Sequence, residues 1–136
     1  MLRFIYFLIP IMFVSYVNTT NALQSDWSGI DEAKVRIISP LSKTGVNDTI
    51  YLGLEYQLQE GWKTYWSSPG EGGYPQTIDW KNSINVSSLE ILWPQPKEFN
   101  ILGLKSIGYE NEVIFPLKVE LENIHHLSFF SFELEY

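Results

Sequence analysis

Period-two alternation of apolar and polar residues is the clearest pattern in this chain of 136 residues. It is strongest over residues 50–59, where large apolar side chains occupy every second position from Ile50 to Leu58. Residues 112–121 and 129–136 alternate in the same way. Such alternation places one face of a strand on a core and leaves the other largely in water. We therefore expect three long strands, each with one buried face.

Shorter segments at residues 33–38, 77–80 and 86–93 also alternate and predict further strands. The turn at Glu60 and Gly61 is expected to lead residues 62–66 back as the hairpin partner of the preceding strand. Pro116, inside the alternating segment 112–121, favours an edge strand or a bulge. No segment shows a useful helix period. About seven short strands separated by turn residues predict an all-β, antiparallel immunoglobulin-like β-sandwich.

The first residues have the layout of a secretory signal peptide. Arg3 supplies a positive charge, residues 4–17 are an apolar run, and the segment ends with small residues up to Ala22. A retained membrane anchor is the alternative, although a membrane span needs about 20 apolar residues. The predicted division is therefore a signal peptide at 1–22, a loose lead-in at 23–32 and one domain at 33–136.

Composition narrows the possible chemistry. The chain has 16 acidic and 9 basic side chains and a formal net charge of −7, which makes it a poor partner for nucleic acid. It has no cysteine, and therefore no thiol for redox or metal chemistry. His125 and His126 are adjacent and would point to opposite faces of a strand, so we expect no shared metal. We expect no cofactor and no catalytic carboxylate.

Large aromatic rings gather in residues 61–75, and we call Trp62, Tyr65, Trp66 and Tyr74 the aromatic wall. The tryptophans most simply supply core volume. The tyrosines, together with the apolar loop expected at residues 95–103, would then form a binding face or a lid over a site.

Three blocks of sequence resemble a known family. They read GWKTYWSSPGEGGYPQTIDW, NVSSLEILWPQP and SIGYENEVIFPLKVEL, in that order and spacing. Together they are similar to the N-terminal periplasmic domain of the DsbD/ScsB thiol:disulfide interchange proteins. The resemblance implies an immunoglobulin-like sandwich in the periplasm. It also implies two kinds of partner: a membrane-embedded transporter segment that supplies electrons, and periplasmic thiol oxidoreductases that receive them through a cysteine pair.

The chain departs from this family at the reactive residues. In relatives, the strand matching residues 129–136 leads into the two redox cysteines, and this sequence stops before them. We therefore expect a domain truncated before its redox pair, which cannot exchange thiols alone because the reaction needs a thiolate. No catalytic residue is carried over. The resemblance does imply a cap loop that binds partners at Phe99, Ile101, Leu102 and Gly103.

A second hypothesis comes from another class of protein. The same aromatic residues would suit a stand-alone β-sandwich module that binds periplasmic glycans or peptides. Quenching of tryptophan fluorescence by such a ligand would distinguish this module from a redox domain.

Overall fold

The structure, a computed structural model, describes residues 22–43 and 45–135, and every regular element in these ranges is a β-strand. The all-β prediction is confirmed. The strands are β1 (Leu23–Gln24), β2 (Ser28–Ile30), β3 (Ala33–Ser39), β4 (Thr49–Leu58), β5 (Lys63–Gly70), β6 (Thr77–Asp79), β7 (Val86–Ile91), β8 (Lys97–Ile101), β9 (Leu104–Glu110), β10 (Glu112–Leu121) and β11 (Glu133–Glu135).

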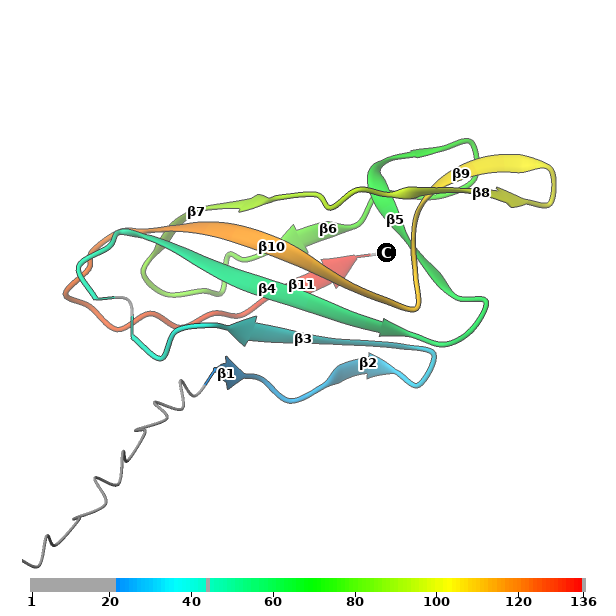
Figure 1. Ribbon diagram of the computed structural model, residues 1–136. Helices are drawn as coiled ribbons and strands as arrows, with labels where there is room; N and C mark the ends of the chain where they lie inside the picture. Colours follow the sequence, from blue (N-terminus) through cyan, green and yellow to red (C-terminus); the bar gives the residue numbers. More distant parts are fainter. Residues whose placement is uncertain (1–21, 44, 136) are drawn as a thin grey trace, which may run out of the picture.

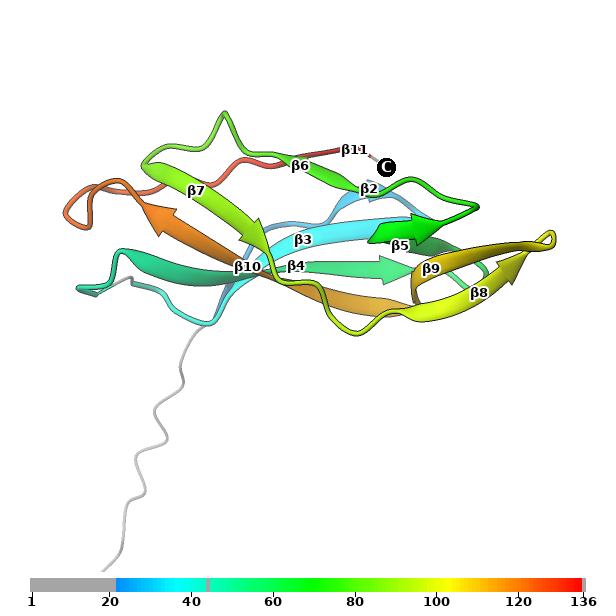
Figure 2. The same cartoon turned by 90° about the horizontal axis from the view of Figure 1, so that it is seen from above.

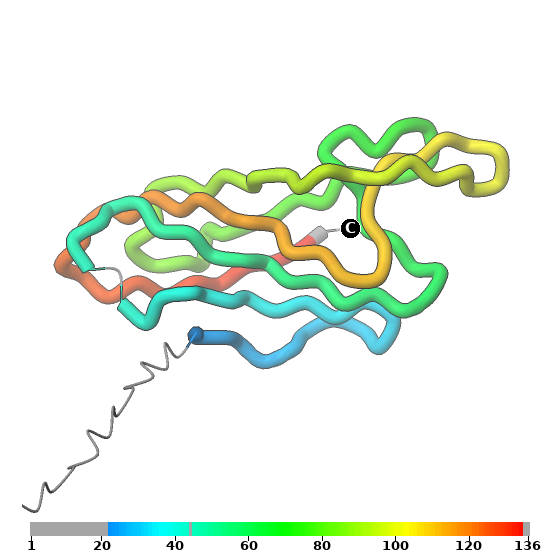
Figure 3. Tube along the Cα trace, viewed as in Figure 1, coloured from blue at the N-terminus to red at the C-terminus, as the bar shows by residue number. Residues whose placement is uncertain are grey.

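The strands form three antiparallel sheets (Figure 1). The largest has the order β1-β3-β4-β10-β7, with β2 also paired to β3. A small sheet has the order β5-β9-β8, and β11 pairs with β6. Seen from above, β6 and β11 form a layer against the large sheet (Figure 2). The trace shows the β8–β9 hairpin extending beyond one end of this immunoglobulin-like sandwich (Figure 3).

The core lies on the inner face of β4 and β10. Phe115, Leu117 and Val119 of β10 are fully buried, as the alternation of residues 112–121 predicted. Three rings from different elements meet Phe115 edge-on, with centroid distances of 4.9 to 5.6 Å. This edge-on geometry is the one that aromatic pairs prefer. The three rings belong to Tyr56, Trp93 and Tyr109.

The predicted hairpin between β4 and the following strand is wrong. Both edges of β4 are occupied, one by β3 and the other by β10, so β5 crosses over and pairs with β9. Trp62 lies in the connection between β4 and β5 and is 45% exposed, so the prediction that it is a core residue is also wrong. A local turn signal could not reveal that the preceding strand β3 and the distant strand β10 occupy both edges of β4.

Pro116 was predicted to mark an edge strand or a bulge. The edge strand is wrong, because β10 is an inner strand, and the register shift of β10 lies between Glu120 and Leu121 instead of at Pro116. Its pairing with β7 begins at Leu117, opposite Ile91, and Pro116 lies just beyond that end. The Pro116 carbonyl accepts a hydrogen bond from the Leu92 amide at 2.8 Å. The missing N–H of Pro116 points to this same side, beyond the last residue of β7, so proline is tolerated there.

The two ends of the described chain depart from their predictions in opposite ways. The segment expected as a loose lead-in contains β1 and β2, both paired with β3. The long strand expected at residues 129–136 is wrong, because regular pairing there is confined to β11. Phe130, Phe132 and Leu134 nevertheless pack against the core as their alternation predicted. Residues 1–21 of the predicted signal peptide lie outside the described residues. Within the described ranges, no helix is long and apolar enough to cross a membrane.

Candidate functional site

The small sheet β5-β9-β8 carries most of the predicted site residues. Tyr65 pairs with Gly108, which pairs in turn with Lys97 on the far strand. Phe99 pairs with Ser106, two residues away along the same strands. Because directly paired residues point to the same face, and so do residues two apart, Tyr65 and Phe99 share one face of this sheet.

A glycine-rich loop after β5 is fastened over that face. The Ser106 hydroxyl donates to the Gly72 carbonyl at 2.7 Å, and Ser106 is completely buried. The Glu71 amide donates to the Lys105 carbonyl at 2.8 Å. The Lys105 amide donates back to the Glu71 carboxylate at 3.1 Å. We call residues 71–76 the latched loop, because Glu71 and Gly72 at its start are hydrogen-bonded to β9.

The latched loop approaches the sheet so closely that glycine is required at one position. A Cβ on Gly73 would lie 2.4 Å from the Tyr65 ring, which is far inside van der Waals contact. Gly73 and Ser106 were not predicted to be site residues. The available signal was the pair Gly72-Gly73 beside a bulky ring, because adjacent glycines permit a close approach of backbone to a side chain.

Residues 95–103 were expected to form a loop, and this expectation is wrong. They contain β8, which is joined to β9 by a two-residue turn. Leu102 and Gly103 have φ angles of 53° and 86°, a pair of positive values typical of a type I′ hairpin turn. The Asn100 side-chain oxygen accepts a hydrogen bond from the Gly103 amide at 2.9 Å. The turn was missed because leucine is not a residue that normally signals positive φ.

The four residues predicted for the cap loop lie in this one hairpin but present different surfaces. Phe99 is half-buried, with the Lys63 ammonium 4.8 Å above its ring in a cation–π contact. Ile101 is also half-buried, whereas Gly103 is exposed at the tip. Leu102 is 99% exposed. The hairpin therefore has a fully exposed apolar side chain at its tip and half-buried apolar side chains along β8.

The aromatic wall is not one continuous surface. Tyr65 packs on the latched loop, while Trp66 packs against the core with its indole N–H buried and unpaired in the described chain. Tyr74 is 81% exposed at the outer side of the loop, and Trp62 lies in the β4–β5 connection. Among these four, Tyr65 is the residue that shares the face of Phe99.

The charged side chains of the small sheet pair with one another at its surface. Lys97 pairs with Glu110 at 3.2 Å and Lys105 pairs with Glu98 at 3.6 Å, both near the surface where ion pairs stabilise little. Burial raises the pKa of Tyr109 to about 12, which keeps its hydroxyl protonated. Across residues 22–43 and 45–135, no cluster of three or more potential metal ligands is present, and His125 and His126 are exposed.

Comparisons with known proteins agree with the architecture. The family described as "Thiol:disulfide interchange protein DsbD, N-terminal" matches residues 35–136. The crystal structure of the N-terminal periplasmic domain of ScsB from Proteus mirabilis is similar, with 29% identity and a TM-score of 0.63. That match covers 82% of this chain and 49% of the ScsB chain, so the present chain spans about half the length of its structural relative. No curated protein matches. The chain belongs to the family of the N-terminal domain of the thiol:disulfide interchange protein DsbD.

Proposed function

We propose that this domain acts in the periplasm as the docking frame of a thiol:disulfide interchange protein, through which electrons reach periplasmic thiol oxidoreductases. Family membership and the periplasmic origin of the ScsB domain support this location and role.

The chain supplies a frame and no reactive group of its own. Thiol–disulfide exchange proceeds by attack of a thiolate on a disulfide sulfur, and this sequence contains no cysteine. By resemblance, relatives carry their redox pair shortly after the strand matched by residues 129–136. The pairing of Glu135 with Thr77, directly after the latched loop, supports a redox site beside that loop. Alone, the chain is therefore inactive as a reductase.

The observation that carries the docking role is the exposed side chain of Leu102. Leucine in the left-handed backbone region costs roughly 1–2 kcal/mol, because its Cβ approaches the following carbonyl. Here that cost is combined with almost complete exposure of an apolar side chain to water. Strained, exposed residues of this kind are typical of recognition sites. We infer that Leu102 enters an apolar pocket on the oxidoreductase partner.

Calorimetric titration with a periplasmic thiol oxidoreductase from the same genome tests this role. The substitution Leu102→Ser is expected to weaken binding about tenfold, the loss expected for one apolar anchor. Val46→Ser is the matched control, since Val46 is 86% exposed in the β3–β4 connection, at the opposite end of the sandwich (Figure 1). Equal losses for the two variants would contradict docking through the hairpin tip.

A redox assay tests the second half of the proposal. The chain alone is expected to leave an oxidised partner oxidised, because no thiolate is available.

The alternative function is tested by measuring tryptophan fluorescence in the presence of glycan fragments and short peptides. Quenching by these ligands, with no binding of the oxidoreductase, would favour the alternative aromatic binding module.

A further inference from the structure

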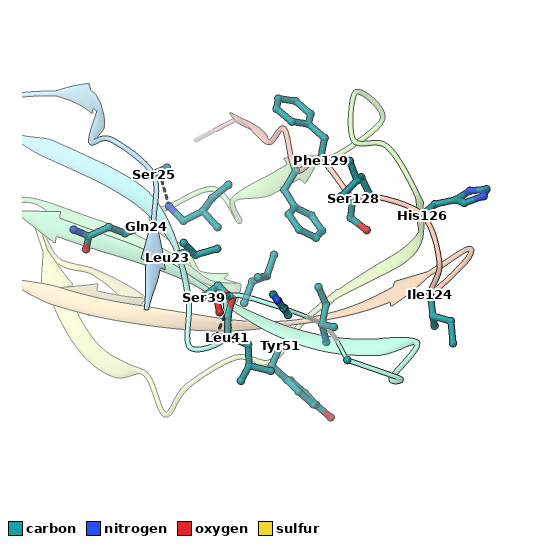
Figure 4. A pocket seen from close by; sticks show the side chains of 18 of the residues that line it. Leu23, Gln24, Ser25, Ser39, Leu41, Tyr51, Ile124, His126, Ser128 and Phe129 are labelled. Atoms are coloured by element: carbon teal, nitrogen blue, oxygen red, sulfur yellow. Dashed lines mark hydrogen bonds between the residues drawn. The ribbon is translucent and has the colours of Figure 1, made fainter. Parts of the chain in front are cut away.

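A pocket of about 680 Å³ lies far from the hairpin, between the first strands and the segment 124–130. Figure 4 shows Leu23, Leu41 and Phe129, which come from three separate parts of the chain, around this space. The volume is in the range of small-molecule sites, about 300–1,000 Å³. Its apolar wall includes Leu23, Ile37, Leu41, Leu52, Leu127 and Phe130.

Exposed apolar side chains are concentrated around this pocket. Leu127 is 94% exposed and Phe129 is 60% exposed, although both are large and apolar. Leu23, Leu41 and Tyr51, each just over half exposed, also line it. Single exposed apolar residues are ordinary, but a contiguous group around a hollow marks a binding surface.

The charge of the pocket is opposite to that of the chain. None of its lining residues is acidic, although acidic side chains outnumber basic ones by 16 to 9 in the sequence. The lining does contain Lys43 and the pair His125 and His126. Lys43 has no ion pair with any described residue, whereas most described lysines contact a carboxylate. An unpaired ammonium at an apolar, acid-free pocket favours an anionic ligand.

Three of the four serine hydroxyls that line the pocket already make hydrogen bonds within the protein. Ser25 donates to the Asp26 carbonyl and accepts from the Ile37 amide. Ser39 donates to the Leu41 carbonyl, and Ser128 accepts from the side chain of Asn85. The Lys43 ammonium is the cationic donor that this lining offers to a ligand. The recognition pattern is therefore one cationic group beside a mainly apolar surface.

We propose that this pocket binds a single-chain fatty acid, with its tail against Ile37, Leu127 and Phe130 and its carboxylate at Lys43. A fatty acid matches the lining because it carries one anionic group and is otherwise apolar. Its flexible tail also needs no hydrogen-bonding partner, unlike a peptide backbone, whose unpaired groups are costly to bury. This proposal is independent of the docking role of the hairpin.

Calorimetric titration of the protein with dodecanoate, below the concentration at which it forms micelles, tests the site. Dodecyl alcohol has the same tail without the charge and is expected to bind about tenfold more weakly. Lys43→Gln is expected to weaken dodecanoate binding by a similar factor and to leave alcohol binding unchanged. Lys81→Gln is the matched control, because Lys81 is an exposed lysine away from the pocket.

A second variant addresses the apolar wall. Leu127→Asp places an acidic group in the pocket at a side chain that is already exposed, so the fold is expected to persist and dodecanoate binding to be lost. Equal affinity for dodecanoate, dodecyl alcohol and dodecyltrimethylammonium would overturn the proposal, since it would show general adsorption to an apolar surface. Absence of dodecanoate binding, or wild-type binding by both pocket variants, would overturn it as well.

Discussion

The hydroxyl of Tyr109 donates a hydrogen bond of 2.8 Å to the carbonyl of Pro94. Tyr109 belongs to β9, and Pro94 lies in the connection between β7 and β8. The Tyr109 ring also meets Phe115 edge-on, with centroids 4.9 Å apart. One side chain therefore joins the small sheet to the core of the sandwich and fixes where the β8–β9 hairpin begins.

Tyr109→Phe is expected to destabilise the protein by about 1 kcal/mol, because it removes this hydrogen bond and keeps the ring. Urea unfolding measures the change in the free energy of unfolding. Tyr51→Phe is the control, since Tyr51 is half exposed on the surface of β4. If the two variants were equally stable, the hydrogen bond to Pro94 would have no structural role.

Alkaline pH is expected to weaken the fold through the same residue. The pKa of Tyr109 is raised by burial from 10.0 to about 12, so the protonated hydroxyl is favoured in the folded state. Its contribution to stability is complete below pH 10 and is lost as the pH rises through about 12. Melting temperatures across this range should fall more steeply for the wild type than for Tyr109→Phe. Parallel curves would contradict the assignment.

Asn85 organises the turn after β10, and its loss is expected to be costly. Its buried amide nitrogen donates to the Asn123 and His126 carbonyls and to the Ser128 hydroxyl, while its oxygen accepts from the Asn123 amide. Asn85→Ala should lower the free energy of unfolding by about 2–4 kcal/mol, measured by urea unfolding.

Two further substitutions show which property of Asn85 accounts for the stability that Asn85→Ala loses. Its φ is 64°, so Asn85→Gly removes the side-chain bonds without adding backbone strain and should cost somewhat less than alanine. Asn47→Ala, in an exposed turn, should change stability little. A small effect of both Asn85 substitutions would show that the turn holds without the side chain.

Leu102→Gly is expected to stabilise the protein by about 0.5–1 kcal/mol. Glycine adopts the φ of 53° without strain, and the leucine side chain contributes no burial to lose. Val46→Gly, at an exposed position without positive φ, should instead be neutral or destabilising. Thermal unfolding of both variants checks this contrast. A destabilised Leu102→Gly would mean that the tip is held by contacts of the leucine itself.

The sequence predicted those parts of the fold that depend on local alternation. Ile50 to Leu58 and Val113 to Leu121 form the buried faces of β4 and β10, as expected. Pairing between strands was less predictable, because β4 selects β10 over the adjacent β5, a choice that depends on contacts distant in sequence. The edge assignment from Pro116 failed for a similar reason, since it depended on where β7 ends.

The candidate site was only partly predictable. Phe99 and Tyr65 were identified from their type, and the structure brings both to one face of the small sheet. The latched loop was not foreseen, because the hydrogen bond between Ser106 and Gly72 joins positions that no local pattern connects. The exposure of Leu102 also required the hairpin geometry, since an apolar residue in an expected loop could equally have covered the core.

Because β4 lies between β3 and β10, its two edges are paired at different times as the chain is synthesised from its N-terminus. One edge of β4 can pair with β3 as soon as residue 58 has been synthesised. The other edge must wait for residues 112–120, and until then its hydrogen-bonding groups are open to other chains. We therefore expect newly made molecules to be most prone to aggregation during this interval.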